Sequence, residues 1–223
     1  MREDLWKLYD VRLDFITSLC ASVPANENLV RTWLDARKPE ARPPQSRSID
    51  DIQEEVLSTI AVAEDEQEIV NKSLLIFQRV DGCLAVRAAT LRAHLKDCAR
   101  QISVYFVGKI KGEKSFATKV INCVYPDERT YWVTLLDQND KPFSEPSGKR
   151  DKPVHTWQGN SLKTFEFVND AHLTFRLKVL GGGVKLKDLD TLFTYGGTHG
   201  YAGERGDGEG RYVATITEIN KEE

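Results

Sequence analysis

The sequence predicts a protein of the α+β class, because strand-like and helix-like patterns follow one another along the chain. Residues 8–17 and 172–180 alternate apolar and polar side chains, as expected for strands that bury one face. Residues 90–102 and 185–195 place apolar side chains at helical spacing, which is typical of helices that cover a sheet. Residues 211–219 are rich in β-branched side chains and read as a final strand. We therefore expect these helices and strands to share one apolar core.

Two long segments interrupt this pattern and are predicted to be insertions. Residues 37–72 begin with a proline-rich loop and continue with apolar side chains at helical spacing, which predicts a helical insertion. Residues 107–153 are basic and contain several glycines, which predicts a basic loop or hairpin. Within the second segment, residues 119–125 and 130–136 read as two strands. Residues 137–153 have so little apolar content that we expect a flexible loop.

Composition limits the classes of protein that fit the chain. Its 223 residues are 40% hydrophobic and 29% charged, as in an ordinary globular protein. No apolar run is long enough to cross a bilayer, and the N-terminus lacks the apolar region of a secretory signal. The four cysteines form no C-x-x-C pair. We expect a cytoplasmic protein with no membrane segment, no metal site and no cofactor.

Charge is distributed unevenly along the chain, although the net charge is only −3. Basic side chains are concentrated between residues 72 and 187, whereas both ends of the chain are acidic. A localised basic surface is typical of proteins that bind a polyanion. Basic and acidic faces can equally neutralise each other within a fold or between subunits. The charge pattern alone leaves both interpretations open.

The most distinctive segment is TYGGTHGYAGERGDGEGRYVATI, residues 194–216. Seven of the fifteen glycines lie between Gly196 and Gly210, and Gly196 is placed to cap the preceding helix. Glycine lets the main chain approach a ligand closely, and free amides can form a cradle for phosphate. The order helix, loop, strand excludes the dinucleotide-binding fingerprint, and no Gly-Lys-Ser/Thr is present for a P-loop. The segment is therefore either a different kind of glycine-rich binding loop or a connector that packs closely on the sheet.

This segment resembles the signature loop of the RAMP superfamily, the repeat-associated RNA-binding proteins of CRISPR systems and their relatives in mobile elements. That loop is rich in glycine and ends in G-x-G-Arg-aromatic before the last strand. The matching residues are Gly196, Gly197, Gly200, Gly203, Arg205, Gly208, Gly210, Arg211 and Tyr212. The chain departs from the family by carrying Glu204, Asp207 and Glu209 in the loop. These acids weaken the attraction for a phosphate chain, unless they pair with Arg205 and Arg211 or face a neighbouring subunit.

The resemblance implies one domain over residues 1–223, with a ferredoxin-like (RRM-like) β-α-β-β-α-β core. The segment 172–219 would form the second half of this core. Its first half would be the strand at 8–17, one of the early helices, and a strand within residues 74–87. Before residue 172 the resemblance is therefore one of topology and not of motif.

The resemblance also implies a function: a non-catalytic subunit of a CRISPR-like, phage or mobile-element ribonucleoprotein in a prokaryotic cytoplasm. Such a subunit would bind RNA, or else single-stranded DNA, beside other protein subunits or copies of itself. Trp157 and Tyr201 would stack on bases. The phosphate contacts would come from loop residues, from basic side chains on the core, and from the basic insertion. The predicted contacts are Gly197, Gly200, Gly203, Arg205, Gly208, Gly210, Arg211, Arg176, Lys178, Lys185, Lys187, Lys149 and Arg150.

Two other functions stay open at this point. Some relatives cut RNA with a histidine as general acid or base, and His199 in the loop is the best candidate for that role. Asp81 and Asp97 are weaker candidates for a metal-dependent endoribonuclease. The third function is that of a structural protein that oligomerises and binds no nucleic acid. Its acidic and basic segments would then form complementary patches between subunits.

Overall fold

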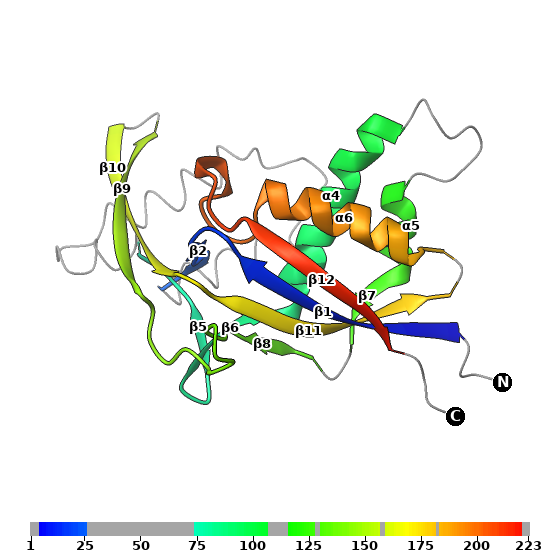
Figure 1. The fold of residues 1–223 in the computed structure, drawn as a ribbon. Helices are drawn as coiled ribbons and strands as arrows, with labels where there is room; N and C mark the ends of the chain where they lie inside the picture. The colour runs from blue at the N-terminus through cyan, green and yellow to red at the C-terminus, as the bar shows by residue number, and fades with distance from the viewer. Residues whose placement is uncertain are drawn as a thin grey trace, which may run out of the picture. The chain divides into compact units, whose positions relative to one another are not determined.

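The structure is a computed structural model that describes residues 5–25, 74–106, 116–127, 130–156, 159–181 and 183–219 (Figure 1). It confirms the predicted α+β class, with helices and several antiparallel sheets. The chain divides into two compact units. The first comprises Met1–Cys20, Gln78–Ser147 and Phe167–Glu223, and the second comprises Ala21–Phe77 and Gly148–Glu166. The predicted helical insertion at 37–72 lies outside the described residues.

The first unit is built on a four-stranded antiparallel sheet. Its strands lie in the order β12 (Tyr212–Ile219), β1 (Trp6–Phe15), β11 (His172–Leu180) and β7 (Val124–Pro126). Two long helices connect them, α4 (Ala88–Phe106) between β1 and β7, and α6 (Leu186–His199) between β11 and β12. Along the chain the core elements therefore follow one another as strand, helix, strand, strand, helix, strand.

Alternation along the strands places the apolar core of this unit on one face of the sheet. Tyr9, Val11, Leu13 and Phe15 of β1 are buried, whereas the side chains between them are not. The β11 residues from Leu173 to Val179 follow the same rule. Helices α4 and α6 contact each other and cover this face (Figure 1). Burial of these side chains provides most of the driving force for folding of the unit.

The first half of the core differs from the prediction. Residues 74–87 contribute no strand to the core sheet. They form β4 (Leu74–Ile76), β5 (Gln78–Val80) and β6 (Cys83–Arg87), and β5 and β6 join β8 (Trp132–Thr134) in a separate three-stranded sheet. The core helix is α4, which follows β6 without a break, and the core strand is the short β7. Alternation shows that a segment can be a strand but does not show which strand it pairs with.

The segment predicted as a strand at 119–125 is mostly helical. Helix α5 (Phe116–Cys123) buries Ala117 and Val120, three residues apart, and runs directly into β7. Its β-branched and aromatic composition favours a strand, but packing against α4 overrides this weak preference. The second strand predicted there, at 130–136, is present only as β8.

The second unit contradicts part of the prediction of a flexible loop at 137–153, because residues 148–153 belong to a strand. Strand β9 (Gly148–Thr156) pairs with β10 (Gly159–Val168), so main-chain hydrogen bonds order a segment that has few apolar side chains. Strand β10 also pairs in parallel with β4, which pairs with β3 (Val23–Pro24). Glu166 is buried in this unit, where its carboxylate accepts a 3.0 Å hydrogen bond from the Phe77 amide.

Candidate functional site

Several glycines of the segment that joins α6 to β12 make contacts that leave no room for a side chain. Helix α6 continues past Gly196, so the prediction that Gly196 caps the helix is wrong. The helix ends instead at Gly200, which has a φ of 82° and donates to the Gly196 carbonyl at 2.9 Å. A methyl group on Gly197 would meet the Tyr212 carbonyl oxygen, and one on Gly196 would meet the Tyr212 hydroxyl. These glycines therefore let the first residue of β12 lie directly against the last turn of α6.

The main-chain amides of the loop are bonded within the protein. Gly203 donates to the Cys20 carbonyl at 3.0 Å and Gly210 to the Ser18 carbonyl at 2.9 Å, which ties the loop to the chain after β1. The amides with internal partners are those of Gly200, Tyr201, Gly203, Asp207, Gly208, Glu209, Gly210 and Arg211. An amide that already has a partner cannot cradle a phosphate without losing that bond. The predicted cradle of free amides is therefore wrong at these positions, and a ligand at this loop has to be bound by side chains of its non-glycine residues.

Tyr201 does not present its ring to a ligand, contrary to the prediction that it stacks on a base. Its side chain is buried, and its hydroxyl lies 2.6 Å from the Thr90 hydroxyl. Burial raises the pKa of this phenol above its ordinary value. Tyr201 thus holds the loop against α4. The other predicted stacking residue, Trp157, lies outside the described residues.

Three of the sequence-predicted residues meet at one side of the last turn of α6. Arg205 Nη1 lies 3.0 Å from His199 Nε2 and 3.2 Å from Asp97 Oδ2, and the His199 and Asp97 atoms are 3.3 Å apart. We call His199, Asp97 and Arg205 the loop cluster. It adjoins an open hollow of about 570 Å³ whose lining includes His199 and Arg205. Asp81 is not part of it, because it lies in the turn between β5 and β6.

The contacts of the loop cluster depend on the protonation of His199. A guanidinium group can only donate, so the bond from Arg205 requires a bare Nε2 and a neutral imidazole. In the other tautomer Nε2 carries the proton, and the nearest acceptor is then the Asp97 carboxylate. The cluster can therefore move a proton at Nε2, and it can hold an anion when Arg205 turns away from Asp97.

A buried histidine supports the loop cluster from behind. His94 Nε2 lies 2.9 Å from the Tyr212 hydroxyl, and its ring stacks at 6.3 Å from that of His199. The pKa of His94 is lowered to about 4, mainly by desolvation and also by the nearby charges of Arg205 and His199, against the opposing effect of Asp97. His94 is therefore neutral at pH 7. It packs inside the unit between α4 and the start of β12.

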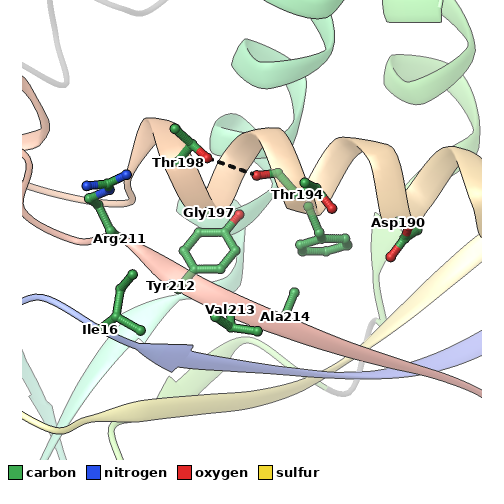
Figure 2. Close-up of a pocket in the computed structure, with 10 residues that line it drawn as sticks. Ile16, Asp190, Thr194, Gly197, Thr198, Arg211, Tyr212, Val213 and Ala214 are labelled. Atoms are coloured by element: carbon green, nitrogen blue, oxygen red, sulfur yellow. Dashed lines mark hydrogen bonds between the residues drawn. The ribbon is translucent and has the colours of Figure 1, made fainter.

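A groove opens on the other side of α6, between that helix and β12 (Figure 2). Its volume is about 280 Å³. Phe193, Tyr212 and Ala214 give it an apolar floor, while Ile16 and Val213 are exposed at its rim. We call this the α6–β12 groove. The remaining lining residues are Gly197, Thr194, Thr198, Arg211 and Asp190.

Two unpaired charges of opposite sign flank the α6–β12 groove. Figure 2 shows Arg211 at one end and Asp190 at the other. Neither side chain forms an ion pair or hydrogen bond with any residue for which the structure gives a position. Asp190 was missed by the sequence analysis. A signal was present, because Asp190, Thr194 and Thr198 follow one another at intervals of four along the helix and share one face.

The other predicted basic residues lie away from the loop. Arg176 bonds Asp10 at 3.0 Å, and Lys178 Nζ lies 4.5 Å from the centre of the Trp6 ring, both on the sheet face opposite the helices. Lys185 and Lys187 are exposed at the first turn of α6, the end remote from the loop. Lys149 and Arg150 belong to β9 in the second unit. Within the first unit, the structure brings only Arg205 and Arg211 together at the loop.

His172 is buried, although the alternation along residues 172–180 predicts that a polar side chain beside Leu173 faces outward. Its side chain is only 2% exposed, and Nε2 lies 2.9 Å from Asp140 Oδ1 without hydrogen-bond geometry. The main chain of Leu136 pairs with His172 beside the start of β11, and Asp140 in the turn that follows lies against the His172 ring. The side chain of His155 lies outside the described set.

The described residues contain neither a cluster of metal-binding side chains nor a helix that could span a membrane. In the part of the chain that the structure describes, no three His, Cys, Asp or Glu side chains are grouped to hold a metal ion. Across the same ranges, the helices are too short or too polar to span a membrane.

Comparison with known proteins gives little further information. No protein-family model matches the sequence, and no curated protein matches it. The chain is similar to one chain of a solved structure described as "Type IV-B CRISPR Complex", with 10% sequence identity and a TM-score of 0.45. The match covers 94% of this chain and 90% of that chain. A similarity of this size carries no argument about fold or function.

Proposed function

We propose that the chain is a non-catalytic subunit that binds single-stranded nucleic acid, RNA in the first place, within a CRISPR-like or mobile-element ribonucleoprotein. The observation that carries this proposal is Arg211. It is the arginine of the G-x-G-Arg-Tyr motif, it is exposed, and no described residue pairs with it. An arginine held in this state is suited to a phosphate, because its planar fork of donors can bind two phosphate oxygens at once.

The backbone beneath Arg211 supports the same proposal. The Arg211 amide donates to the Thr17 hydroxyl at 2.9 Å, its carbonyl accepts from Ile16 at 2.8 Å, and the preceding Gly210 amide is bonded to Ser18. The residue is therefore fixed on both sides before a ligand arrives, which reduces the entropy lost on binding. The order of helices and strands around β1 and β11 is also that of a ferredoxin-like core, on which we propose that this subunit is built.

The proposal is tested by binding of labelled single-stranded RNA to the whole chain between about 50 mM and about 200 mM salt. We expect affinity to fall steeply with salt, and Arg211→Ala to reduce the slope by about one. Arg100→Ala, which removes an exposed arginine of α4, is the matched control and should leave the slope unchanged. Absence of binding to RNA and to DNA at low salt overturns the proposal, and self-association without nucleic acid would favour an oligomerising structural protein.

A second candidate is an endoribonuclease, favoured by the loop cluster alone. His199 Nε2 lies beside an arginine and a carboxylate at the edge of an open hollow, so it can act on a bound phosphodiester as base or acid. Incubation of structured RNA with the wild-type chain and with His199→Ala, each with and without a chelator, tests this. Cleavage that His199→Ala abolishes supports the nuclease, and no cleavage by the wild-type chain excludes it.

A further inference from the structure

We propose that the α6–β12 groove holds one nucleotide of the bound strand, with its phosphate at Arg211, and that Asp190 selects a base that carries an exocyclic amino group. This inference rests on the proposed function, because it assigns a subsite to the same ligand. It differs from that proposal in predicting a base preference, which a surface that only binds phosphates does not have.

The size and lining of the groove suit a single nucleotide. Its volume of about 280 Å³ lies just below the range for small-molecule sites, roughly 300–1,000 Å³. The floor is apolar, since Phe193 and Tyr212 are buried beneath it, and Ile16 and Val213 stand exposed at the rim. The face of a base is also apolar, so that it gains from contact with such a surface.

The two charges give the groove a direction. Some exposed charges of this unit are neutralised by neighbours, as Arg176 is by Asp10 and Lys7 by Glu218. Arg211 and Asp190 are left without such partners at opposite ends of the groove. A ligand that complements both has an anion at one end and a hydrogen-bond donor at the other. A nucleotide with an amino base meets this requirement.

Asp190 also determines where the strand continues. Two negative charges about 4 Å apart repel by several kcal/mol near a protein surface, so a second phosphate cannot lie beside this carboxylate. The strand must therefore enter and leave at the Arg211 end, with the base pointing along α6 towards Asp190. This places the base edge, and not the backbone, against the carboxylate.

The chemistry of a carboxylate sets the preference. An ionised aspartate only accepts hydrogen bonds, so it binds the amino group of cytosine, as carboxylates do in base recognition. Uracil has a carbonyl oxygen at the corresponding position, which repels the carboxylate. Cytosine is therefore favoured over uracil at this subsite, by about tenfold if one such contact is made.

The test compares oligo(C) and oligo(U) RNA of equal length, since both are pyrimidine strands and differ at the relevant position. Affinities are measured for the whole chain and for Asp190→Asn, Arg211→Ala and Asp81→Asn. We expect the wild-type chain to prefer oligo(C) about tenfold, and Asp190→Asn to lose this preference because an amide also donates. Arg211→Ala should weaken both strands by a similar factor. Asp81→Asn, which changes an exposed aspartate in the turn between β5 and β6, should behave as wild type.

The outcomes separate this inference from the proposed function. If the wild-type chain binds RNA but shows no preference, or if Asp190→Asn retains the preference, the subsite is overturned and the binding function stands. If no strand binds even at low salt, the proposed function fails and the subsite fails with it. Thermal unfolding of each variant shows that a lost preference does not come from a lost fold, since all three altered side chains are exposed.

Discussion

The two arginines of the glycine-rich loop are six residues apart and are in opposite states. Arg205 is held by Asp97 and His199, whereas Arg211 has no partner among the residues that the structure places. Both are exposed, and both belong to the motif that the sequence singled out. The difference shows that exposure does not make a charge available. A charged side chain that already has a partner must break that contact before it can bind a ligand. A side chain without a partner, on a main chain held by hydrogen bonds, can bind a ligand directly.

Both arginines depend on one rigid framework, and breaking that framework has the largest expected effect. Gly210 has a φ of 70°, and a methyl group there would meet the Tyr201 main chain. Gly210→Ala adds backbone strain and a clash with main chain that cannot move aside, which together should lower the free energy of unfolding by about 4 kcal/mol. Denaturant unfolding measures this.

Gly206→Ala is the matched control for that substitution. Gly206 lies in the same loop, has no atom near its would-be methyl group, and does not adopt a positive φ. The free energy of unfolding of the Gly206→Ala variant should stay within about 0.5 kcal/mol of wild type. Equal losses from both substitutions would show that the loop is not held by close contacts at Gly210.

The parts of this framework that could be predicted from sequence are those with local patterns. The alternation in β1 and β11 and the apolar stripe of α6 each follow from residues that are neighbours in sequence. The pairing of β11 with the three-residue β7 does not, because so short a strand has no alternation to detect and its partner is chosen by the whole sheet.

The candidate site divides in the same way. Motif resemblance located Arg205, Arg211 and His199, which are close in sequence. It could not show that the loop amides are bonded to Ser18 and Cys20, since those partners come from the distant N-terminal end of the chain. The glycine content alone therefore predicted a phosphate cradle. The structure contradicts this prediction, because hydrogen bonds to residues distant in sequence already occupy the loop amides.

The next largest expected effect is a dependence of stability on pH that is due to His94, the buried histidine that stacks on His199. The pKa of His94 is lowered to about 4, from an ordinary value of 6.5, mainly by desolvation. As pH falls below 6.5 the unfolded chain takes up this proton and the folded chain does not. Stability should therefore fall between about pH 6.5 and about pH 4 by up to about 3 kcal/mol, and stay constant above that window.

Urea unfolding at a series of pH values checks this dependence, and His94→Gln is the comparison. Glutamine can still bond the Tyr212 hydroxyl but does not titrate, so the variant should lose this part of the dependence. Carboxylates contribute to both curves at low pH, and the difference between the two curves removes their share. A difference that does not vary with pH would show that His94 titrates normally.

Substitution of each arginine should also affect the free energy of unfolding differently, although this effect is smaller. Arg205→Gln removes an exposed ion pair and the contact with His199, at a cost of up to about 1 kcal/mol. Arg211→Gln removes no described partner, so its free energy of unfolding should stay within about 0.5 kcal/mol of wild type. The order reverses for RNA affinity, where Arg211→Gln should have the larger effect. If one variant had the larger effect in both measurements, the contrast between the arginines would not hold.

The smallest expected effect isolates the pairing itself. A double-mutant cycle of Arg205→Gln with Asp97→Asn should give a coupling free energy of about 0.5 kcal/mol, since their atoms are 3.2 Å apart at a surface where both side chains are 38% exposed. The same cycle for Arg211→Gln with Asp190→Asn should give a value indistinguishable from zero, because these side chains have no direct contact across the groove. A measurable coupling for the second pair would mean that the groove closes on itself in solution. Arg211 would then be engaged just as Arg205 is, and the capacity of the loop to bind phosphate would have to come from elsewhere on the molecule.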